Sequence, residues 1–316
     1  MFRKKKSIIS VCTYRRPLIL PRCLDSLFRQ QIPEDWDAEI LLVNNDPDCD
    51  LWKNLSGERT SSPMKIHYVV EPRAGIPHAR NTACRESLKL GADWILFLDD
   101  DEEAEPGWLM AYRKASAVLD ADVYTGPVRF LYPAGYAEWL ENKGLWNLPY
   151  GKVLKRAATN NVMFKSELLK PPFDLLFDTR LEFSGGSDID FFMTAAHKGA
   201  TIRYVDDAVV SEVVAENRLR LSWRLYRQYA SSASHIFSKC KLFGFKKTLI
   251  HSSQEVFRRI SAGLLRLLCS PFYLLAGRGS FKRCCYHGFR HFAKAAGIVA
   301  GLLGRRPSPY KNFSGC

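Results

Sequence analysis

The sequence has too few cysteines for a disulfide scaffold and lacks long apolar runs. Nine cysteines are scattered through 316 residues, and no Cys-x-x-Cys occurs. A disulfide scaffold would need a cysteine content of about 8–10% or more, so we expect reduced thiols in a cytoplasmic protein. No apolar stretch approaches the roughly 20 residues that span a bilayer. The run 7–12 is too short for a signal peptide, and two arginines follow it at 15 and 16.

Acidic residues are nearly absent from the last quarter of the chain. Residues 241–316 hold 14 Lys and Arg and a single acid, Glu255, whereas residues 1–240 hold 32 of each sign. The whole net charge of +13 therefore lies in the tail. A neutral body argues against nucleic acid as a partner, and a basic tail points to an anionic surface.

Several common catalytic motifs are also missing. The sequence contains no Walker A motif, no G-x-G-x-x-G, no G-x-S-x-G and no H-E-x-x-H, and its seven histidines form no metal-binding spacing. P-loop, nicotinamide-dependent, serine-hydrolase and zinc-hydrolase chemistries therefore have no support in the sequence.

What is present is an alternation of short apolar runs with helical patterns. Strands are predicted at 7–12, 39–43, 66–70 and 94–98, and helices at 17–31, 77–90 and 106–119. This order predicts an α/β fold with a mostly parallel sheet flanked by helices. Further strands are predicted at 123–130, 161–164 and 202–205, and further helices at 187–198 and 219–237.

The tail has a different pattern. Two basic amphipathic helices are predicted, with apolar stripes over 257–268 and 289–303 and a junction near Gly277–Gly279. Such helices are typical of a peripheral membrane anchor. The alternative is a helical subdomain that packs its stripes on the core. We divide the chain into a domain of residues 1–240 and a membrane-associating region of residues 241–316.

An acidic cluster directly follows the predicted strand at 94–98. Asp99 and Asp101 face the same side if the chain stays extended, and ligands of open α/β sheets bind beyond the carboxyl ends of the strands. Two such carboxylates favour Mg²⁺ or Mn²⁺, which would bridge to substrate phosphates. The alternative is an acidic surface turn before the helix that starts near Pro106.

A second candidate lies at Gly185–Asp190. The glycines let the backbone approach a ligand, and Asp188 in the first turn of a helix could serve as a general base. The alternative is a Ser-x-x-Asp capping box of Ser187 and Asp190, which would leave Asp188 and the glycines unexplained.

The ends of the first two predicted strands offer hydrogen-bonding groups. Thr13–Arg16 and Asn44–Asp46 could frame a planar base, or could simply form turns. The helix entry with Arg73–Gly75, His78, Arg80 and Asn81 suits a diphosphate, or is a solvated face. The aromatic segment Tyr132–Tyr150 is an acceptor platform or part of the core.

Taken together, these motifs resemble the family 2 glycosyltransferases of GT-A fold, and especially bacterial exopolysaccharide enzymes of the succinoglycan β-glucosyltransferase type. The likeness covers about residues 5–235. The segments that carry it are Ser10–Pro17, Val43–Pro47, Glu71–Asn81, Phe97–Glu102 and Gly185–Phe192.

The resemblance implies roles for matching positions. Thr13, Tyr14, Arg15 and Asn45 would hold the uridine, and Arg80 would reach the nucleotide. Within the acidic motif, Asp99 and Asp100 would face the donor, with Asp99 on the ribose side. Asp101, together with Asp99, would bind Mg²⁺ or Mn²⁺. Asp188 would be the catalytic base of an inverting displacement.

Two positions depart from the family pattern, which has acidic residues where Ser187 and Asn44 stand. The Gln-x-x-Arg-Trp motif of processive members is absent, which implies the addition of one sugar. The resemblance thus implies a UDP-sugar donor, such as UDP-glucose, and a polyprenyl-diphosphate-linked saccharide acceptor at the inner face of the plasma membrane. The competing hypotheses are a catalytically inactive relative that binds membranes and a sugar nucleotidyltransferase.

Overall fold

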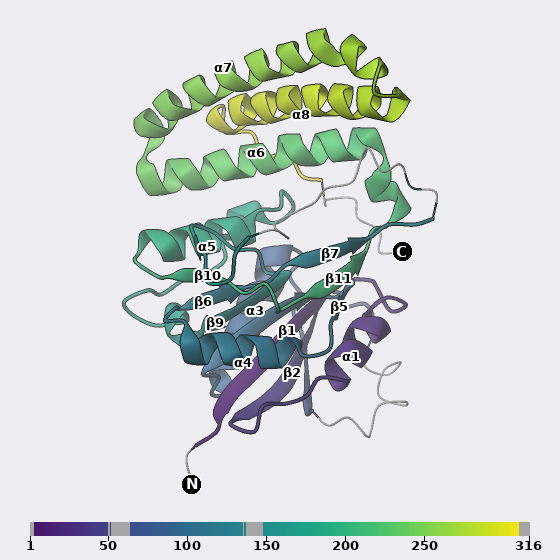
Figure 1. The fold of residues 1–316 in the computed structure, drawn as a ribbon. Coiled ribbons are helices and arrows are strands. Elements are labelled where there is room, and N and C mark those ends of the chain that lie inside the picture. Colours follow the sequence, from purple (N-terminus) through teal and green to yellow (C-terminus); the bar gives the residue numbers. More distant parts are fainter. Residues whose placement is uncertain (1–2, 50, 52–63, 135, 137–147, 310–316) are drawn as a thin grey trace.

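The computed structural model describes residues 3–49, 51, 64–134, 136 and 148–309. These residues form an eight-stranded sheet, a three-stranded sheet and flanking helices (Figure 1). In spatial order the strands of the large sheet are β3 (Ile66–Val70), β2 (Trp36–Asn44), β1 (Lys5–Thr13), β4 (Trp94–Asp99), β9 (Asn161–Lys165), β6 (Val123–Thr125), β10 (Ile202–Tyr204) and β8 (Val153–Leu154).

The sheet is mixed, with a parallel half. Strand β1 pairs in parallel with β2 and β4, and β2 pairs in parallel with β3. Strand β9 is antiparallel to both β4 and β6. The predicted α/β fold with a mostly parallel sheet is confirmed, and the mainly apolar sequences of β1, β2 and β4 follow from burial on both faces.

Helices cover both faces of the sheet, so the core lies in two clusters. On one face, α1 (Leu20–Phe28) and α4 (Trp108–Val118) pack Leu24 and Trp108 against Ile9 of β1. On the other, α3 (Ile76–Lys89) and α5 (Ser187–His197) pack Ala83 and Phe192 against the sheet. Because β1 and β4 are parallel, their carboxyl ends lie at the same edge of the sheet.

The small sheet consists of β5 (Glu102–Ala104), β11 (Val210–Val213) and β7 (Val128–Leu131). The single strand predicted at 123–130 is wrong, because Gly126 and Pro127 break it into β6 and β7 in different sheets. At Gly126 a Cβ atom would stand 1.9 Å from the Ala208 carbonyl oxygen, so only glycine fits this crossing. Strands β5 and β11 were not predicted, because at three and four residues they are too short to show a hydrophobic periodicity.

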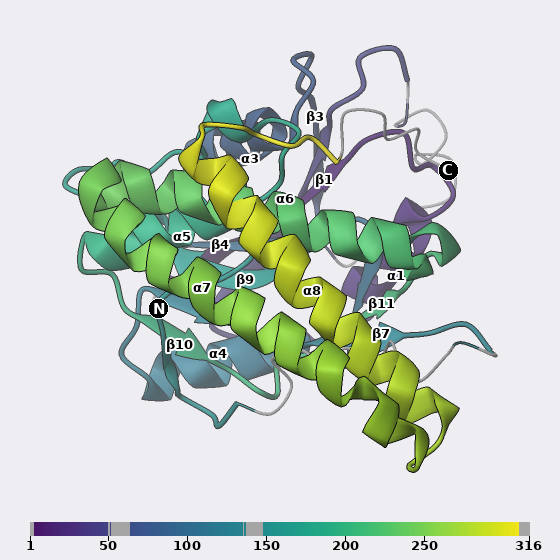
Figure 2. The same cartoon turned by 90° about the horizontal axis from the view of Figure 1, so that it is seen from above.

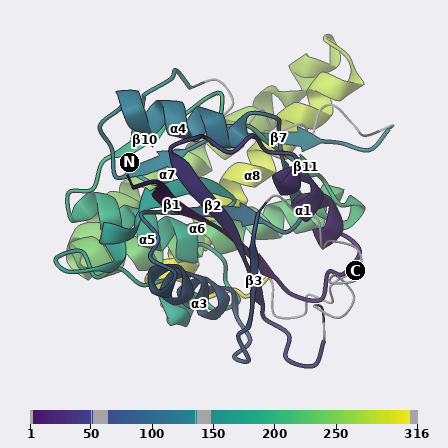
Figure 3. The same cartoon turned by 90° about the horizontal axis from the view of Figure 1, so that it is seen from below.

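The last three long helices form a layer over the carboxyl edge of the sheet. They are α6 (Leu221–Phe243), α7 (Phe245–Cys269) and α8 (Arg278–Leu302). Seen from above, α7 and α8 run side by side and cross α6 (Figure 2). From the opposite side, β1, β2 and α3 lie in front of this layer (Figure 3). The predicted domain boundary at 240 falls within α6, and the predicted helix at 219–237 extends to Phe243.

Glycines let α8 lie close to its neighbours. A Cβ atom at Gly297 would stand 2.2 Å from the Tyr229 carbonyl oxygen of α6, and one at Gly288 would stand 2.8 Å from the Leu267 side chain of α7. Helix α8 also buries Tyr286 and Ile298, whereas Phe289, Val299 and Leu303 of the predicted apolar stripe are exposed. Within the described residues, no helix is long and apolar enough to cross a membrane.

Candidate active site

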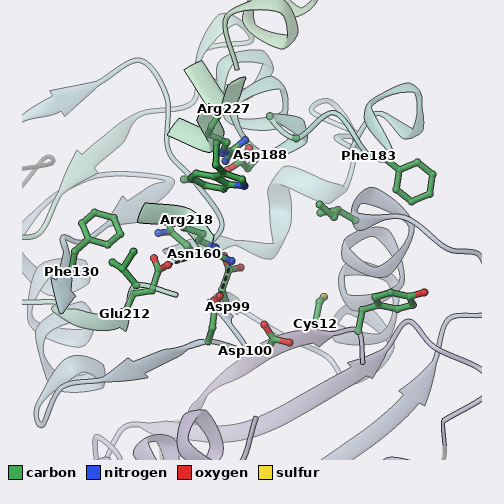
Figure 4. A pocket seen from close by; sticks show the side chains of 18 of the residues that line it. Cys12, Asp99, Asp100, Phe130, Asn160, Phe183, Asp188, Glu212, Arg218 and Arg227 are labelled. Carbon is green, nitrogen blue, oxygen red and sulfur yellow. Dashed lines mark hydrogen bonds and ion pairs between the residues drawn. The ribbon is translucent and has the colours of Figure 1, made fainter. Parts of the chain in front are cut away.

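A cleft of about 960 Å³ lies between the carboxyl edge of the sheet and the helical layer. We call its sheet side, with Asp99–Asp101 at the end of β4 and Glu212 of β11, the acidic floor. We call Arg224 and Arg227 of α6 together with Arg283, His287 and Arg290 of α8 the basic roof; all line the cleft. In Figure 4, Asp99 and Asp100 come from the strand ends and Arg227 comes from the helix above them.

Thr13 and Asp100 join the ends of β1 and β4. The Thr13 hydroxyl donates a hydrogen bond to Asp100 at 2.7 Å, and Arg16 contacts the other oxygen of the same carboxylate at 2.6 Å. Burial raises the pKa of Asp100, and Arg16 opposes that shift. The structure therefore gives Asp100 a fixed place beneath the cleft surface, held by a threonine that was predicted to bind uridine.

The two asparagines after β2 shape the neighbouring loops. Asn44 is fully buried, and its amide nitrogen donates to the carbonyls of Asp46 and Cys49, both at 2.9 Å. A carboxylate cannot donate these bonds, so the turn requires asparagine at this position, where the resemblance implied an acid. Asn45 lines the cleft, but its amide nitrogen donates to the carbonyls of Glu71 and Arg73.

Tyr14 and Arg15 separate at the end of β1. Tyr14 lines the cleft, whereas Arg15 is not among the described residues that line it. Arg15 instead has a φ of 54° and pairs with Asp46 at 2.8 Å, with half of its side chain exposed. The turn interpretation therefore suits Arg15 and Asn44, while Thr13, Tyr14 and Asn45 remain at the cleft.

Of the residues around the start of α3, some line the cleft and others do not. Arg80 lines the cleft, and its guanidinium lies 3.9 Å from an Asp99 oxygen. Arg73 is largely exposed and pairs with Glu71 at 2.9 Å. Asn81 exchanges two hydrogen bonds with the Phe177 backbone. Of the basic residues predicted for a diphosphate, the structure thus places Arg80 in the cleft.

Asp99 and Asp101 offer oxygen ligands of the kind that Mg²⁺ and Mn²⁺ prefer. Desolvation inside the cleft raises the pKa of Asp99 to about 6; Arg80 opposes this, and repulsion from Asp101 and Asp100 adds to it. Asp101 lies 3.0 Å from both Arg16 and Arg218. Among the described residues, no three His, Cys, Asp or Glu side chains form a ready metal cage. Magnesium is usually held by one or two carboxylates and substrate phosphates, so this donor pair fits a cation that arrives with a diphosphate.

Asp188 faces the cleft from the first turn of α5. The N-cap of α5 is Gly186, with a φ of 88° and no side-chain cap, so the alternative interpretation, a Ser187–Asp190 capping box, is wrong. The Ser187 hydroxyl instead accepts a hydrogen bond from Arg80 at 3.0 Å, and the buried Asp190 pairs with Lys241 of α6 at 2.7 Å. The tight glycine turn leaves Asp188 as the acid of this segment that lines the cleft.

Several cleft residues were not predicted from the sequence. Arg218 bridges Asp101 and Glu212, and it lies just before α6. Burial raises the pKa of Glu212 to about 7, Asp101 adds to the shift, and Arg218 opposes it. The tail 241–316 was predicted as a whole to meet a membrane; within it, Arg283 and Arg290 of α8 face the cleft. Their spacing with His287, at i, i+4 and i+7, was the available signal for a shared face.

The aromatic segment contributes Tyr132 to the cleft, where its ring stacks on Tyr136 with centroids 4.4 Å apart. Residues 135 and 137–147 of that segment lie outside the described residues. Cys12 also lines the cleft, and burial raises the pKa of its thiol to about 12, which makes the thiol a poor nucleophile.

Solved structures share this architecture. The crystal structure of S. aureus TarS 1-349 matches with a TM-score of 0.52 and 14% identity, over 95% of this chain and 92% of that chain. The crystal structure of GalNAc-T7 with UDP, GalNAc and Mn²⁺ matches with a TM-score of 0.54 and 15% identity, over 75% of this chain and 48% of that chain. These matches confirm the predicted GT-A-type fold.

The sequence comparisons agree. Residues 8–170 match the family described as Glycosyl transferase family 2. The chain is 30% identical over 307 residues to the succinoglycan biosynthesis protein ExoM of Rhizobium meliloti (strain 1021), which covers 94% of this chain and 92% of that protein. The resemblance predicted from the motifs is confirmed.

Proposed function

The chain belongs to glycosyl transferase family 2, and on this premise we propose that it is an inverting, non-processive enzyme that moves one sugar from a UDP-sugar to a lipid-linked saccharide. One observation carries the proposal: Asp99 and Asp188, distant in sequence, line the same cleft. A relative named for succinoglycan biosynthesis supports a role in surface polysaccharide assembly, with UDP-glucose a suitable donor.

The donor side of the cleft is the edge formed by β1, β2 and β4. Tyr14 and Asn45 flank the space for a uracil ring, and Asp99 and Arg80 lie where ribose and phosphates would follow. The fold neighbour GalNAc-T7 was crystallised with UDP and Mn²⁺. Asp99 and Asp101 would hold Mg²⁺ or Mn²⁺, which as a Lewis acid would offset charge on the departing diphosphate.

The chemistry assigned to the chain is a single displacement. Asp188 accepts the proton of the acceptor hydroxyl, the hydroxyl oxygen bonds to the anomeric carbon, and the bond from that carbon to UDP breaks with its electron pair leaving on UDP. Attack opposite the leaving group inverts the anomeric centre. The contact between Ser187 and Arg80 gives the departure from the family pattern a positioning role, which speaks against the inactive-relative hypothesis.

The test is isothermal titration of UDP with and without Mn²⁺. Wild type should bind UDP more tightly with Mn²⁺, and Asp101→Asn should lose that dependence because one charged oxygen ligand is removed. Asp120→Asn, an exposed aspartate outside the cleft, is the matched control. Absence of UDP binding by wild type under both conditions would reject the proposed donor.

We also propose that the protein is cytoplasmic and lies on the inner face of the plasma membrane through α7, η5 (Ser270–Leu274) and the start of α8. The support is a row of exposed apolar side chains: Phe257 is 75%, Leu268 73%, Phe272 73% and Leu275 92% exposed. Exposed basic residues, among them Arg258, Arg278 and Lys282, lie on the same elements. Apolar burial and attraction to anionic lipids would act together there.

Flotation with vesicles that contain phosphatidylglycerol tests the membrane proposal. Leu268→Glu with Leu275→Glu should reduce binding by about tenfold or more, because each change removes apolar burial and adds a repelled charge. Leu18→Glu, at another leucine that is 83% exposed, is the control and should leave binding unchanged. Equal binding by all three proteins would reject this surface.

A further inference from the structure

We propose that the basic roof binds the diphosphate of the acceptor, as an anion site separate from the one that holds UDP. This inference rests on the proposed function, since it assigns a place to the lipid-linked acceptor. The roof consists of Arg224 and Arg227 of α6 and Arg283, His287 and Arg290 of α8, all of which line the cleft.

The cations of the cleft form two groups that differ in their contacts. Arg16 and Arg218 pair with floor carboxylates at 2.6–3.0 Å, and Arg80 lies 3.9 Å from Asp99. In the roof, Arg224 meets the Tyr136 hydroxyl and lies 5.7 Å from the Tyr286 ring centre, and Arg290 donates to the Gln228 side chain at 3.3 Å. Arg224 and Arg290 are therefore oriented by uncharged groups, which do not neutralise their positive charge.

The layer that carries the roof has almost no acid to balance it. From Leu221 to the end of the chain, the sequence contains one acidic residue, Glu255. Glu255 pairs with Arg259 and Lys239. Burial and the neighbouring Arg266 and Arg290 lower the pKa of His287. A site with this excess of positive charge favours an anion with more than one negative charge.

The roof lies on the side of the cleft that holds the proposed base. A Cβ atom at Gly186 would stand 3.1 Å from the Ser234 side chain, so α6 passes directly over the turn that presents Asp188. Arg227 precedes Ser234 by two helical turns, or about 10 Å along α6. An acceptor whose diphosphate meets the roof would therefore extend its sugar toward Asp188, while UDP occupies the strand ends.

The chemistry of the side chains suits a sugar diphosphate. Guanidinium groups form paired hydrogen bonds with phosphate oxygens. Tyr132 and Trp223 line the same cleft and offer flat aromatic faces of the kind that sugar rings contact. Basic and aromatic groups therefore line the same cleft as the proposed base.

Two titrations on the full chain test the site. Inorganic pyrophosphate is titrated in EDTA, where metal-assisted binding at the floor is suppressed, and UDP is titrated with Mn²⁺. Arg227→Gln with Arg290→Gln should weaken pyrophosphate binding by about tenfold or more and leave UDP affinity within about twofold. Arg29→Gln with Lys114→Gln, which removes two exposed charges outside the cleft, is the control. Circular dichroism checks folding, and Arg227→Lys with Arg290→Lys replaces the glutamine pair if that pair is unfolded.

The outcomes separate the possible errors. An equal loss of UDP and pyrophosphate affinity would assign the roof to the donor and overturn the inference. Unchanged pyrophosphate binding in the roof variant, or none in wild type, would also overturn it. Loss of binding to phosphatidylglycerol vesicles with pyrophosphate binding intact would assign the roof to lipid headgroups instead. If wild type binds pyrophosphate but not UDP, the proposed donor fails and the anion site stands.

Discussion

The floor and the roof of the cleft are built in opposite ways. The floor consists of strand ends, and its carboxylates are fixed by partners from elsewhere in the chain, as Asp100 is by Thr13 of β1 and by Arg16 in the loop after it. The roof consists of two long helices, and Arg224 and Arg290 are oriented by a phenol, an aromatic ring and an amide. The floor carboxylates thus have cationic partners within the protein, whereas Arg224 and Arg290 of the roof contact neutral groups and have charge available for a ligand.

This difference suggests a division of labour. Charges that are paired in the folded protein are already positioned before substrate arrives, which suits a donor site whose geometry must be exact for displacement. Charges held by neutral groups gain most from an incoming anion. Substitutions in the two regions should therefore have different consequences for activity and stability. Four predictions test this difference.

The largest expected effect is on the chemical step at the boundary of the two regions. Asp188→Asn keeps the shape of the side chain but cannot accept the acceptor proton, so transfer should fall by about 10²–10⁴-fold. UDP affinity should stay within about twofold, since Asp188 is placed on the acceptor side. Sugar transfer and UDP titration on the same preparation measure both. Retention of full transfer activity would remove Asp188 from the mechanism.

The next effect concerns the attachment of the roof. Gly297→Ala places a Cβ atom 2.2 Å from the Tyr229 carbonyl oxygen, and a backbone atom cannot yield as a side chain can. We expect a loss of about 3 kcal/mol in the free energy of unfolding, the upper part of the usual overpacking range. Urea denaturation measures it.

A second glycine of α8 provides the control. No atom lies within 4 Å of a Cβ atom at Gly279, so Gly279→Ala should be neutral or stabilise the protein by up to about 1 kcal/mol through helix propensity. If both variants had the same stability, the close approach of α6 and α8 would not be required for folding.

The floor was largely predictable from the sequence because strand ends are local signals. An apolar run followed by Asp99–Asp101 predicts acids at the carboxyl edge of a sheet, and the order of such motifs carried the resemblance. The sequence could not decide between base binding and a turn for Asn44 and Arg15, because their partners, the Cys49 carbonyl and Asp46, are set by how the turn folds. Periodicity does not report those contacts.

The roof was not predicted, although its helices were. Amphipathic periodicity located α7 and α8, but it cannot tell which partner a basic face meets. The whole tail was predicted to meet a membrane, yet Arg283 and Arg290 line the cleft, where the close approaches at Gly288 and Gly297 hold α8 against its neighbours. That information lies in tertiary packing between helices far apart in the chain.

A third prediction measures how much a paired carboxylate, Glu71, stabilises the edge of the sheet. Hydrogen bonds from Arg73 and Thr82 lower the pKa of the buried Glu71 from its ordinary 4.5 to about 2. Glu71→Gln should cost about 2 kcal/mol near neutral pH, since charge-assisted bonds become neutral ones. A lowered pKa stabilises the fold fully above pH 4.5, and that contribution is lost as the pH falls toward 2.

The measurement is urea denaturation of both proteins across that range. The difference in the free energy of unfolding between wild type and Glu71→Gln should be constant above pH 4.5 and shrink below it. Protonation of Glu71 removes the negative charge in wild type, and the substitution has already removed that charge in the variant. A difference that does not change with pH would mean that the glutamine variant fails through packing rather than through charge.

The smallest effect tests the opposite situation, an unbalanced charge in the helical layer. Burial and the nearby Arg290 and Arg259 lower the pKa of Lys294 from 10.5 to about 8, while Glu255 opposes the shift. Between pH 8 and 10.5 the unfolded chain therefore binds more protons than the folded one, so stability should rise with pH. Solvent screening limits the gain to about 1 kcal/mol.

In Lys294→Met the rise of stability with pH should be smaller than in wild type by that amount, while Lys282→Met, at an exposed lysine of the same helix, should keep the full rise. If Lys294→Met kept the whole rise, the positive charge of the helical layer would already be neutralised within the protein, and the contrast between floor and roof would fail.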